Sequence, residues 1–463
     1  MLIVASHGKL RHSRCCWLLA AALVLGAGSA RPQEGKIPPP PPTRTDDVVD
    51  VLHGVRIPDP YRWLEDQQSP ETRAWINAQN QYTNSLLDAW PGRAALKQRL
   101  TELMKVDTIG IPYERGGRYF FRKRLADQDQ GILYMREGLG GKDEVLVDPN
   151  PLSPDHALSV ELEDISLDGA LMAYGLRHGG EDEVAIHLLD VAKRSDLPDV
   201  LPKARYFGVS LKPDKTGFYY GVNAKEGPRI FYHTLGADPT RDAEVFGKGY
   251  GPDKIIFAGL SEDGRYLLIH VLYGSAADRT EVYFQDLAAH GPIRPVVNDI
   301  PARFYADIGG DEVFLHTNWK APKGRILAVN LKDPARERWR EVVPQGDSAI
   351  ESVSLAGGKV LVSYLENAHS RVKEFDASGK YLRDIALPAL GSVSGISGRW
   401  SSQEMFYGFT SFVIPQTIYR TSLASGEQSL WARIQVPLRS EDFQVEQVWY
   451  KAKDGTRVPM FLV

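Results

Sequence analysis

The chain has 463 residues, of which 43% are hydrophobic, 25% are charged and 10% are aromatic, and its formal net charge is −4. This composition is that of a globular protein and excludes a largely disordered chain, a collagen and a coiled coil. The pI of about 6.3 indicates no basic footprint, so we expect no nucleic-acid partner. The length is too great for one compact core unless the architecture is radial or repetitive.

The first 30 residues have the three parts of a secretory signal peptide: a basic start from Lys9 to Arg14, an apolar run from Trp17 to Gly26, and small residues at Gly28-Ser-Ala30. The only cysteines, Cys15 and Cys16, precede the apolar run, which argues against a lipoprotein signal. We therefore expect an exported protein, periplasmic or secreted, with no stable membrane association after cleavage. An uncleaved membrane anchor is the alternative.

The next two segments differ from the rest of the chain. Residues 31–45 include five consecutive prolines and are interpreted as an extended spacer. In residues 46–105, Ser69-Pro-Glu-Thr72 is typical of a helix start, and apolar residues recur near helical spacing from Glu71 to Leu87. A second helix is predicted from about Gly92 to Met104. The segment 46–105 is therefore predicted to be α-helical.

From about residue 106 to 438 the helical period is replaced by short strands that alternate with turn residues. A repeating unit is visible, in which a polar or glycine turn precedes a strand rich in aromatic and aliphatic residues. The turns are anchored at Gly117, Asp168, Asp214, Asp263, Gly310, Gly358 and Gln403. Their intervals of 51, 46, 49, 47, 48 and 45 residues predict seven four-stranded blades of a β-propeller. A stack of unrelated β-sandwiches is the alternative.

Residues 439–463 change character again. A strand pattern is followed by a hairpin turn at Lys453–Thr456, and the chain stops inside the next predicted strand. A strand with exposed edge groups is an unusual end for a protein, so this end is interpreted as a truncation.

Motifs that would define a catalytic centre are missing. The sequence contains no Gly-x-Ser-x-Gly, no His-Glu-x-x-His and no phosphate-binding Gly-x-x-x-x-Gly-Lys-Ser/Thr. Ser394 and Ser397 lie near glycines, but their segment is interpreted as a blade turn. A propeller channel could gather histidines around a metal, but we favour satisfied or surface histidines and expect no metal and no cofactor. The histidines in or beside predicted strands are His187, His233, His270 and His316.

Two longer motifs carry a resemblance to a known family. The segments Asp59-Pro-Tyr-Arg-Trp-Leu-Glu-Asp66 and Lys453-Asp-Gly-Thr-Arg-Val-Pro-Met-Phe461, with weaker matches between them, resemble the prolyl oligopeptidase family of serine peptidases. The resemblance covers about residues 46–463. It implies a mainly β protein, in which a seven-bladed propeller at 106–438 follows a helical segment at 46–105 of an α/β-hydrolase domain. The first strands of the rest of that domain, which is incomplete, would occupy 439–463.

The resemblance also implies a function. The full-length protein would be a monomeric serine endopeptidase that cleaves short peptides after proline, and its propeller would limit access to the active site. No catalytic residue can be carried over, because the Ser-His-Asp triad would lie beyond Val463, and the chain alone is predicted to be inactive. One substrate-binding residue is carried over, Tyr206, which follows the family motif at Leu197–Leu201; an ordinary core or loop aromatic is the alternative there. For the whole chain, the alternative is a free-standing secreted propeller that binds a ligand or a protein.

Overall fold

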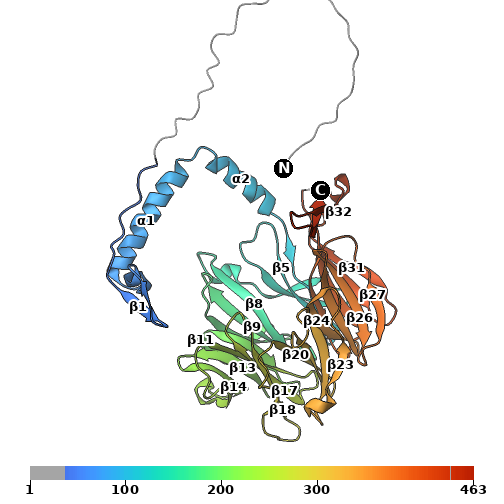
Figure 1. The fold of residues 1–463 in the computed structure, drawn as a ribbon. Coiled ribbons are helices and arrows are strands. Elements are labelled where there is room, and N and C mark those ends of the chain that lie inside the picture. Colours follow the sequence, from blue (N-terminus) through green and yellow to red (C-terminus); the bar gives the residue numbers. More distant parts are fainter. Residues whose placement is uncertain (1–36, 438) are drawn as a thin grey trace, which may run out of the picture. The chain divides into compact units, whose positions relative to one another are not determined.

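The computed structural model describes residues 37–437 and 439–463 and divides into two compact units, Met1–Arg99 and Leu100–Val463 (Figure 1). The signal peptide predicted for residues 1–30 lies outside the described residues. Each unit is described by itself below. Among the described residues, no helix is both long enough and apolar enough to cross a bilayer.

The first unit contains a β-hairpin, a short 3-10 helix and a long helix, and a second helix crosses into the next unit. Ser69 caps the long helix, because its Oγ accepts a 3.1 Å hydrogen bond from the backbone N–H of Thr72, and Pro70 occupies the first helical position. The two predicted helices are thereby confirmed, but residues 49–58 of the segment form a β-hairpin that the sequence did not predict. The elements are β1 (Val49–Leu52), β2 (Val55–Pro58), η1 (Arg62–Glu65), α1 (Pro70–Asp88) and α2 (Arg93–Met104).

The proline run lies along α1. The Tyr82 hydroxyl donates to the carbonyl oxygen of Pro38 at 2.6 Å, and Gln79 Nε2 donates to that of Pro41 at 3.0 Å. Near the other end of the run, Trp75 Nε1 donates to Thr43 Oγ1 at 2.9 Å. Residues 38–43 of the predicted spacer are therefore held by hydrogen bonds along the helix.

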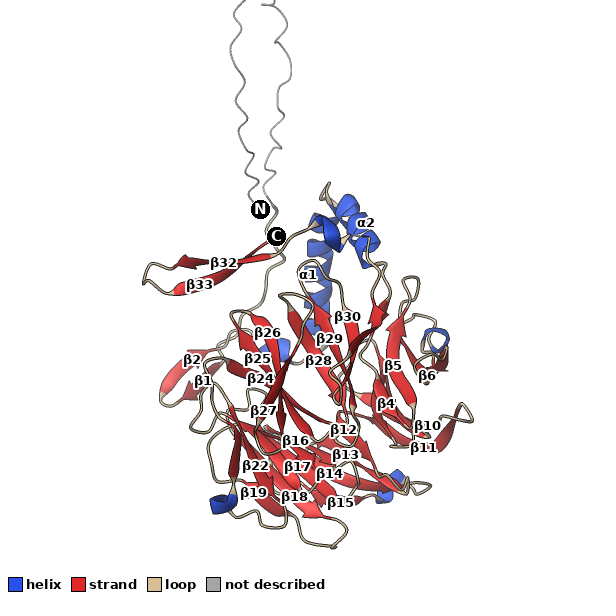
Figure 2. Ribbon diagram, turned by 90° about the vertical axis from the view of Figure 1, so that its right-hand side faces the viewer, coloured by secondary structure: helices blue, strands red, loops and turns tan. Residues whose placement is uncertain are grey.

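The second unit is a ring of seven antiparallel sheets, drawn as red strands in Figure 2. Each sheet is made of strands that are consecutive in the sequence, so the predicted seven-bladed propeller is confirmed. We number the blades 1 to 7 in chain order. The first strand of each blade forms the inner edge of the ring, and in blade 1 this edge is shared by two short strands, β3 and β4, which both pair with β5.

The strands are grouped by their position in the blade. The first strands are β3 (Thr108–Ile109) with β4 (Tyr113–Arg115), β8 (Leu158–Ile165), β12 (Tyr206–Leu211), β16 (Lys254–Leu260), β20 (Phe304–Gly309), β24 (Ala349–Ala356) and β28 (Ser392–Gly398). The second strands are β5 (Arg118–Arg124), β9 (Leu171–His178), β13 (Gly217–Ala224), β17 (Tyr266–Tyr273), β21 (Glu312–Thr317), β25 (Lys359–Glu366) and β29 (Glu404–Thr410). The third strands are β6 (Ile132–Glu137), β10 (Val184–Asp190), β14 (Gly227–Thr234), β18 (Thr280–Asp286), β22 (Arg325–Asn330), β26 (His369–Asp376) and β30 (Thr417–Ser422). The fourth strands are β7 (Asp143–Val147), β11 (Ser195–Ala204), β15 (Ala243–Phe246), β19 (Arg294–Val297), β23 (Arg340–Val343), β27 (Tyr381–Ile385) and β31 (Gln428–Arg433).

The second and third strands are apolar on both faces because each blade is covered by two neighbours. Phe120 and Phe121 are adjacent in β5 and therefore point to opposite faces of blade 1. Phe120 packs with Val160 of blade 2, whereas Phe121 meets the Trp431 ring of blade 7 edge-on, at 5.0 Å between centroids. Continuous apolar runs in these strands are the pattern that made the repeat visible in the sequence.

The ring is closed between blades 7 and 1 by side chains. All seven sheets consist of consecutive strands, so no described strand from the end of the chain is inserted into blade 1. Instead, the Tyr119 hydroxyl of β5 donates to the carboxylate of Glu404 in β29 at 3.0 Å, and the Tyr119 ring meets the Phe406 ring at 5.6 Å. We call this junction the seam.

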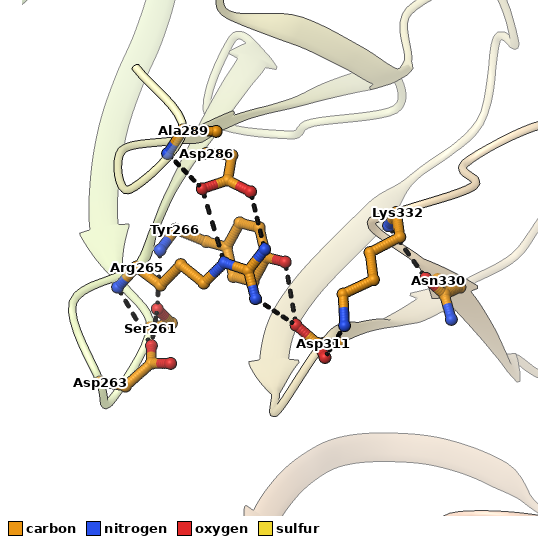
Figure 3. Close-up of polar contacts among 9 residues, drawn as sticks. All are labelled: Ser261, Asp263, Arg265, Tyr266, Asp286, Ala289, Asp311, Asn330 and Lys332. Atoms are coloured by element: carbon orange, nitrogen blue, oxygen red, sulfur yellow. Dashed lines mark hydrogen bonds and ion pairs between the residues drawn. The ribbon is translucent and has the colours of Figure 1, made fainter. Parts of the chain in front are cut away.

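Charged residues join blades 4 and 5 near the turns that follow their first strands (Figure 3). The Asp311 carboxylate accepts hydrogen bonds from Arg265 Nη1 at 3.0 Å, from the Tyr266 hydroxyl at 3.0 Å and from Lys332 Nζ at 2.6 Å. Arg265 also donates to Asp286 at 3.0 Å. We call these five residues the clasp.

The segment around Ser394 and Ser397 was predicted to be a blade turn, and this prediction is wrong. Both residues lie in β28, the inner strand of blade 7. The strand contains glycine because a neighbour approaches closely: a Cβ on Gly398 would lie 2.7 Å from the Cβ of Ala356 in blade 6. The glycines therefore mark close packing between inner strands.

Residues after the ring form a short 3-10 helix, η5 (Ser440–Asp442), and a hairpin of β32 (Glu446–Lys451) and β33 (Arg457–Leu462). The Phe461 ring lies 5.4 Å from the Phe412 ring of blade 7. The assignment of residues 439–463 to the start of a hydrolase domain stays a prediction.

Candidate functional site in the propeller channel

The inner strands of all seven blades line a cavity of about 410 Å³. In a blade of four antiparallel strands, the first strand begins and the fourth ends on the same face of the ring. We call this the proximal face and the opposite one the distal face. The cavity is lined by the last residues of the first strands, among them Arg115, Leu211, Leu260 and Gly398, so it lies at the distal end of the channel.

Three charged residues from different blades meet at this end. Arg399 follows β28 in blade 7, and its Nη2 donates to Glu114 of blade 1 at 2.7 Å. Its Nη1 donates at 2.8 Å to Glu262, in the turn after β16 of blade 4. Blade 4 lies across the ring from blade 7, so these contacts span the channel. We call Arg399, Glu114 and Glu262 the distal bridge.

The turn that carries Glu262 is fixed by its own hydrogen bonds. Ser261 Oγ donates to Asp263 at 2.6 Å and accepts from the backbone N–H of Tyr266 at 2.9 Å. The equivalent turn of blade 2 repeats this arrangement with Ser166 Oγ, which donates to Asp168 at 2.7 Å and accepts from Leu171 N–H at 2.9 Å. These hydrogen bonds fix the backbone of the turn, and so the point from which the Glu262 side chain reaches Arg399.

Burial shifts the pKa of two further groups at this end. The Asp164 carboxylate accepts backbone hydrogen bonds from Leu211 at 2.7 Å and from Ile165 at 2.8 Å, but burial still raises its pKa to about 6. Burial also lowers the pKa of Arg115, whose Nε has no hydrogen-bond partner among the described residues. The distal cavity is therefore a polar chamber whose charged groups are partly withdrawn from solvent.

The structure places Tyr206, the predicted substrate-binding residue, at the start of β12. Its hydroxyl donates to the carbonyl oxygen of Pro202, and its ring meets that of Tyr220 edge-on at 5.9 Å. Burial raises the pKa of the Tyr206 hydroxyl. Tyr206 is not among the residues that line the distal cavity. Its role in substrate binding stays a prediction.

The histidines considered for a metal site lie in four different blades. They are His187 in β10, His233 in β14, His270 in β17 and His316 in β21. Within residues 37–437 and 439–463, no group of three or more histidine, aspartate, glutamate or cysteine side chains is arranged to hold a metal. His233 is fully buried between two carboxylates, with Nε2 3.1 Å from Asp199 and Nδ1 2.9 Å from Asp242.

The distal bridge had no signal in the sequence. Arg399 is 137 residues from Glu262 and 285 residues from Glu114, and no motif links the three positions. Their shared place in the repeat was the only clue, because each lies at or just after the end of a first strand. The first strands lack the apolar run of the second strands, so the sequence does not mark where they end.

Seven consecutive sheets arranged in a ring around a central channel define the fold as a β-propeller. Ion pairs cross this channel at its distal end. The family described as the prolyl oligopeptidase N-terminal beta-propeller domain matches residues 40–433. The chain belongs to this family.

Relatives and solved structures agree with this assignment. The chain is 30% identical to a prolyl endopeptidase of Elizabethkingia meningoseptica over 96% of its own length and 63% of the relative's. It is 36% identical to a prolyl endopeptidase of known structure, with a TM-score of 0.84, over 91% of this chain and 64% of the other. Prolyl oligopeptidase B from Galerina marginata, solved with a 35mer hydrolysis and macrocyclization substrate, is 25% identical, with a TM-score of 0.80, over 91% and 64% of the two chains. The chain thus spans less than two thirds of the relatives' length.

Proposed function

We propose that this chain is the helical segment and propeller of a prolyl oligopeptidase, a serine endopeptidase that cleaves short peptides after proline. Family membership over residues 40–433 and relatives named prolyl endopeptidase support the proposal. In this proposal, the part of the relatives that the chain does not match supplies a Ser-His-Asp triad, and cleavage proceeds through a serine ester. The protein acts as a monomer without a cofactor, and residues 1–463 alone are inactive.

The role of the propeller in this proposal is to restrict access to the active site. The distal bridge is the observation that carries it. Arg399 connects blades 1, 4 and 7 across the distal end of the channel, and these contacts would obstruct the passage of a folded polypeptide there. Only short or extended peptides would reach an active site on the proximal side.

The test compares residues 1–463 with a chain that continues in frame beyond Val463. We expect only the longer chain to hydrolyse a Gly-Pro-based chromogenic peptide, and a serine-directed inhibitor should abolish that activity. In the longer chain, Glu262→Gln weakens the bridge and should increase kcat/KM for peptides of about 30 residues more than for the chromogenic peptide. Glu337→Gln, a change at an exposed glutamate in blade 5, is the matched control.

Two results would contradict the proposal. Serine-dependent cleavage after proline by residues 1–463 alone would place the nucleophile inside this chain. A longer chain that shows no peptidase activity would favour the alternative, a free-standing secreted propeller that binds a ligand or a protein.

We also propose that the protein is exported to the periplasm or secreted, because residues 1–30 have the pattern of a signal peptide. N-terminal sequencing of the protein from its native host should find a mature start near Arg31. Retention of Met1 on a cytoplasmic protein would contradict export.

A further inference from the structure

A second cavity, of about 430 Å³, opens beside β20 in the channel wall of blades 4, 5 and 6. We call it the side cavity. Apolar and aromatic side chains form much of its wall, among them Phe257 and Leu268 of blade 4, Phe314 of blade 5 and Val353 of blade 6. Its volume is in the range of pockets that hold small ligands or single side chains of a peptide.

The side cavity contains a carboxylate without a partner. Asp307 of β20 lines the cavity, and its carboxylate makes no hydrogen bond or ion pair with any described residue. Strand register places Phe314 opposite Asp307, and Tyr305, two residues away on the same strand, shares its face of blade 5. The carboxylate is thus flanked by aromatic rings. Asp307 is exposed to the open channel, but desolvation by the channel wall raises the pKa of its carboxyl to about 6, so it is mostly ionised at pH 7.5.

No cation of the protein lines this cavity. Its other titratable groups are Glu351, His270, His316 and the phenol of Tyr305. Burial lowers the pKa of His270 to about 4 and also lowers that of His316, so both rings are neutral at pH 7.5. Arg303 lines an adjoining cavity, where it faces His316. Asp307 also lines the distal cavity, where Arg399 is paired with Glu114 and Glu262. The wall of the side cavity itself therefore carries negative charge without a positive side chain.

A buried donor is also unpaired. His270 is 6% exposed, and its Nε2 accepts a 3.1 Å hydrogen bond from the backbone N–H of Ala306. The proton of the neutral ring must then be on Nδ1, and Nδ1 has no hydrogen-bond partner among the described residues. A buried unpaired donor costs free energy that a ligand acceptor would recover.

We propose that the side cavity is a peptide-binding subsite for a basic residue. Its cationic group pairs with Asp307, its apolar stem lies against the aromatic wall, and a peptide carbonyl accepts the Nδ1–H of His270. The cation is a lysine or arginine side chain or the N-terminal ammonium of the peptide. This inference deepens the proposed function, because its ligand is a peptide in the channel, but it concerns binding by this chain alone.

The test is calorimetric titration of residues 1–463 with acetyl-Gly-Arg-Pro-Gly-amide at pH 7.5. Citrulline has the shape of arginine without its charge, so the citrulline peptide should bind about tenfold more weakly. Asp307→Asn should weaken binding of the arginine peptide to the same level and leave binding of the citrulline peptide unchanged. Asp333→Asn, at an exposed carboxylate of blade 5, is the matched control and should change neither affinity.

Two further arms locate the contacts. His270→Gln keeps an acceptor for the N–H of Ala306 but removes the Nδ1 donor. It should therefore lower the affinity for the arginine peptide and for the citrulline peptide by a similar factor. A citrulline peptide with a free N-terminus that binds as tightly as the arginine peptide would identify the ammonium as the cation. Thermal melting is the check on folding, and Asp307→Asn should keep or raise the Tm because it removes an unpaired charge.

The proposal is overturned if the arginine and citrulline peptides bind equally, if neither binds at millimolar concentration, or if Asp307→Asn leaves the difference between them intact. None of these results depends on catalysis. A failed peptidase assay therefore contradicts the proposed function, whereas a failed titration contradicts only the subsite.

Discussion

Arg399 and Glu262 meet across the channel at 2.8 Å, although 137 residues separate them and they belong to blades 7 and 4. Neither side chain is more than a quarter exposed, at 21% for Arg399 and 23% for Glu262. An ion pair shielded in this way is less screened than one on the open surface. The contact therefore contributes both to the stability of the ring and to the closure of its distal end.

The first prediction is a coupling energy for this pair. A double-mutant cycle with Arg399→Met and Glu262→Gln should give about 1–2 kcal/mol, because the hydrogen bond is charged and partly buried. The exposed pair of Arg338 and Asp333 should give less than about 0.5 kcal/mol in the same cycle. Urea unfolding of residues 1–463 measures both. Equal coupling in the two cycles would mean that the distal bridge is no stronger than a surface contact.

The second prediction concerns acid stability. Glu281 is 4% exposed and accepts hydrogen bonds from Tyr250 at 2.7 Å, Tyr273 at 2.6 Å and Tyr283 at 2.9 Å, and another from Arg279 at 2.8 Å. Burial would raise the pKa of Glu281, but these hydrogen bonds outweigh it and lower the pKa below its usual range. The unfolded chain therefore takes up a proton at this site before the folded chain does. The stabilisation is complete above the unfolded pKa and is lost as the pH falls through the folded pKa.

Glu281→Gln should therefore destabilise the protein by about 3 kcal/mol at pH 7, because an amide cannot accept all four hydrogen bonds. The difference from the unsubstituted chain should stay constant above about pH 5 and shrink below about pH 4. Urea unfolding across this range measures it, with Glu337→Gln as the exposed control. A difference that does not change with pH would contradict the assignment to this carboxylate.

The third prediction concerns His233, which is completely buried between Asp199 and Asp242. His233→Phe should cost about 3–5 kcal/mol, because it removes the ring nitrogens that contact two buried carboxylates. Adding Asp242→Asn to this variant should recover part of the loss. At the surface pair of His178 and Asp155, the same His178→Phe change should cost less than about 0.5 kcal/mol. Thermal melts of these three variants and of the unsubstituted chain provide the measurement.

The fourth prediction concerns the clasp of Figure 3. Although Asp311 has three donors, its side chain is 40% exposed, so solvent competes for every contact. Asp311→Ala should therefore cost no more than about 1 kcal/mol. The loss should decrease further when the salt concentration is raised from 0.05 to 1 M, because exposed charges are screened. A cost above 2 kcal/mol that is insensitive to salt would show that the clasp behaves as a buried network.

The sequence was sufficient to predict the ring because the second strands are apolar and follow their turns at a regular spacing. The first strands were harder to recognise. They line a channel instead of packing on two neighbours, so polar and glycine residues such as Ser394 and Gly398 replace the apolar run. The distal bridge and the side cavity are built from these strands and the turns after them, so neither could be derived from periodicity. The unsatisfied Nδ1 of His270 also differs from our expectation of satisfied or surface histidines, because pairing of a side chain depends on its spatial neighbours.

Every blade is built from strands that are consecutive in the sequence, so the ring does not depend on which blade comes first in the chain. The polypeptide enters at Thr108 and leaves at Arg433 on the same face, and no sheet shares a strand with another. Relinking these ends and opening the chain between any two blades would produce circular permutants in which all seven sheets keep their strands. Blades 7 and 1 would then be joined by the polypeptide, as the other neighbouring blades are now. The two blades on either side of the new opening would be held together by side-chain contacts alone.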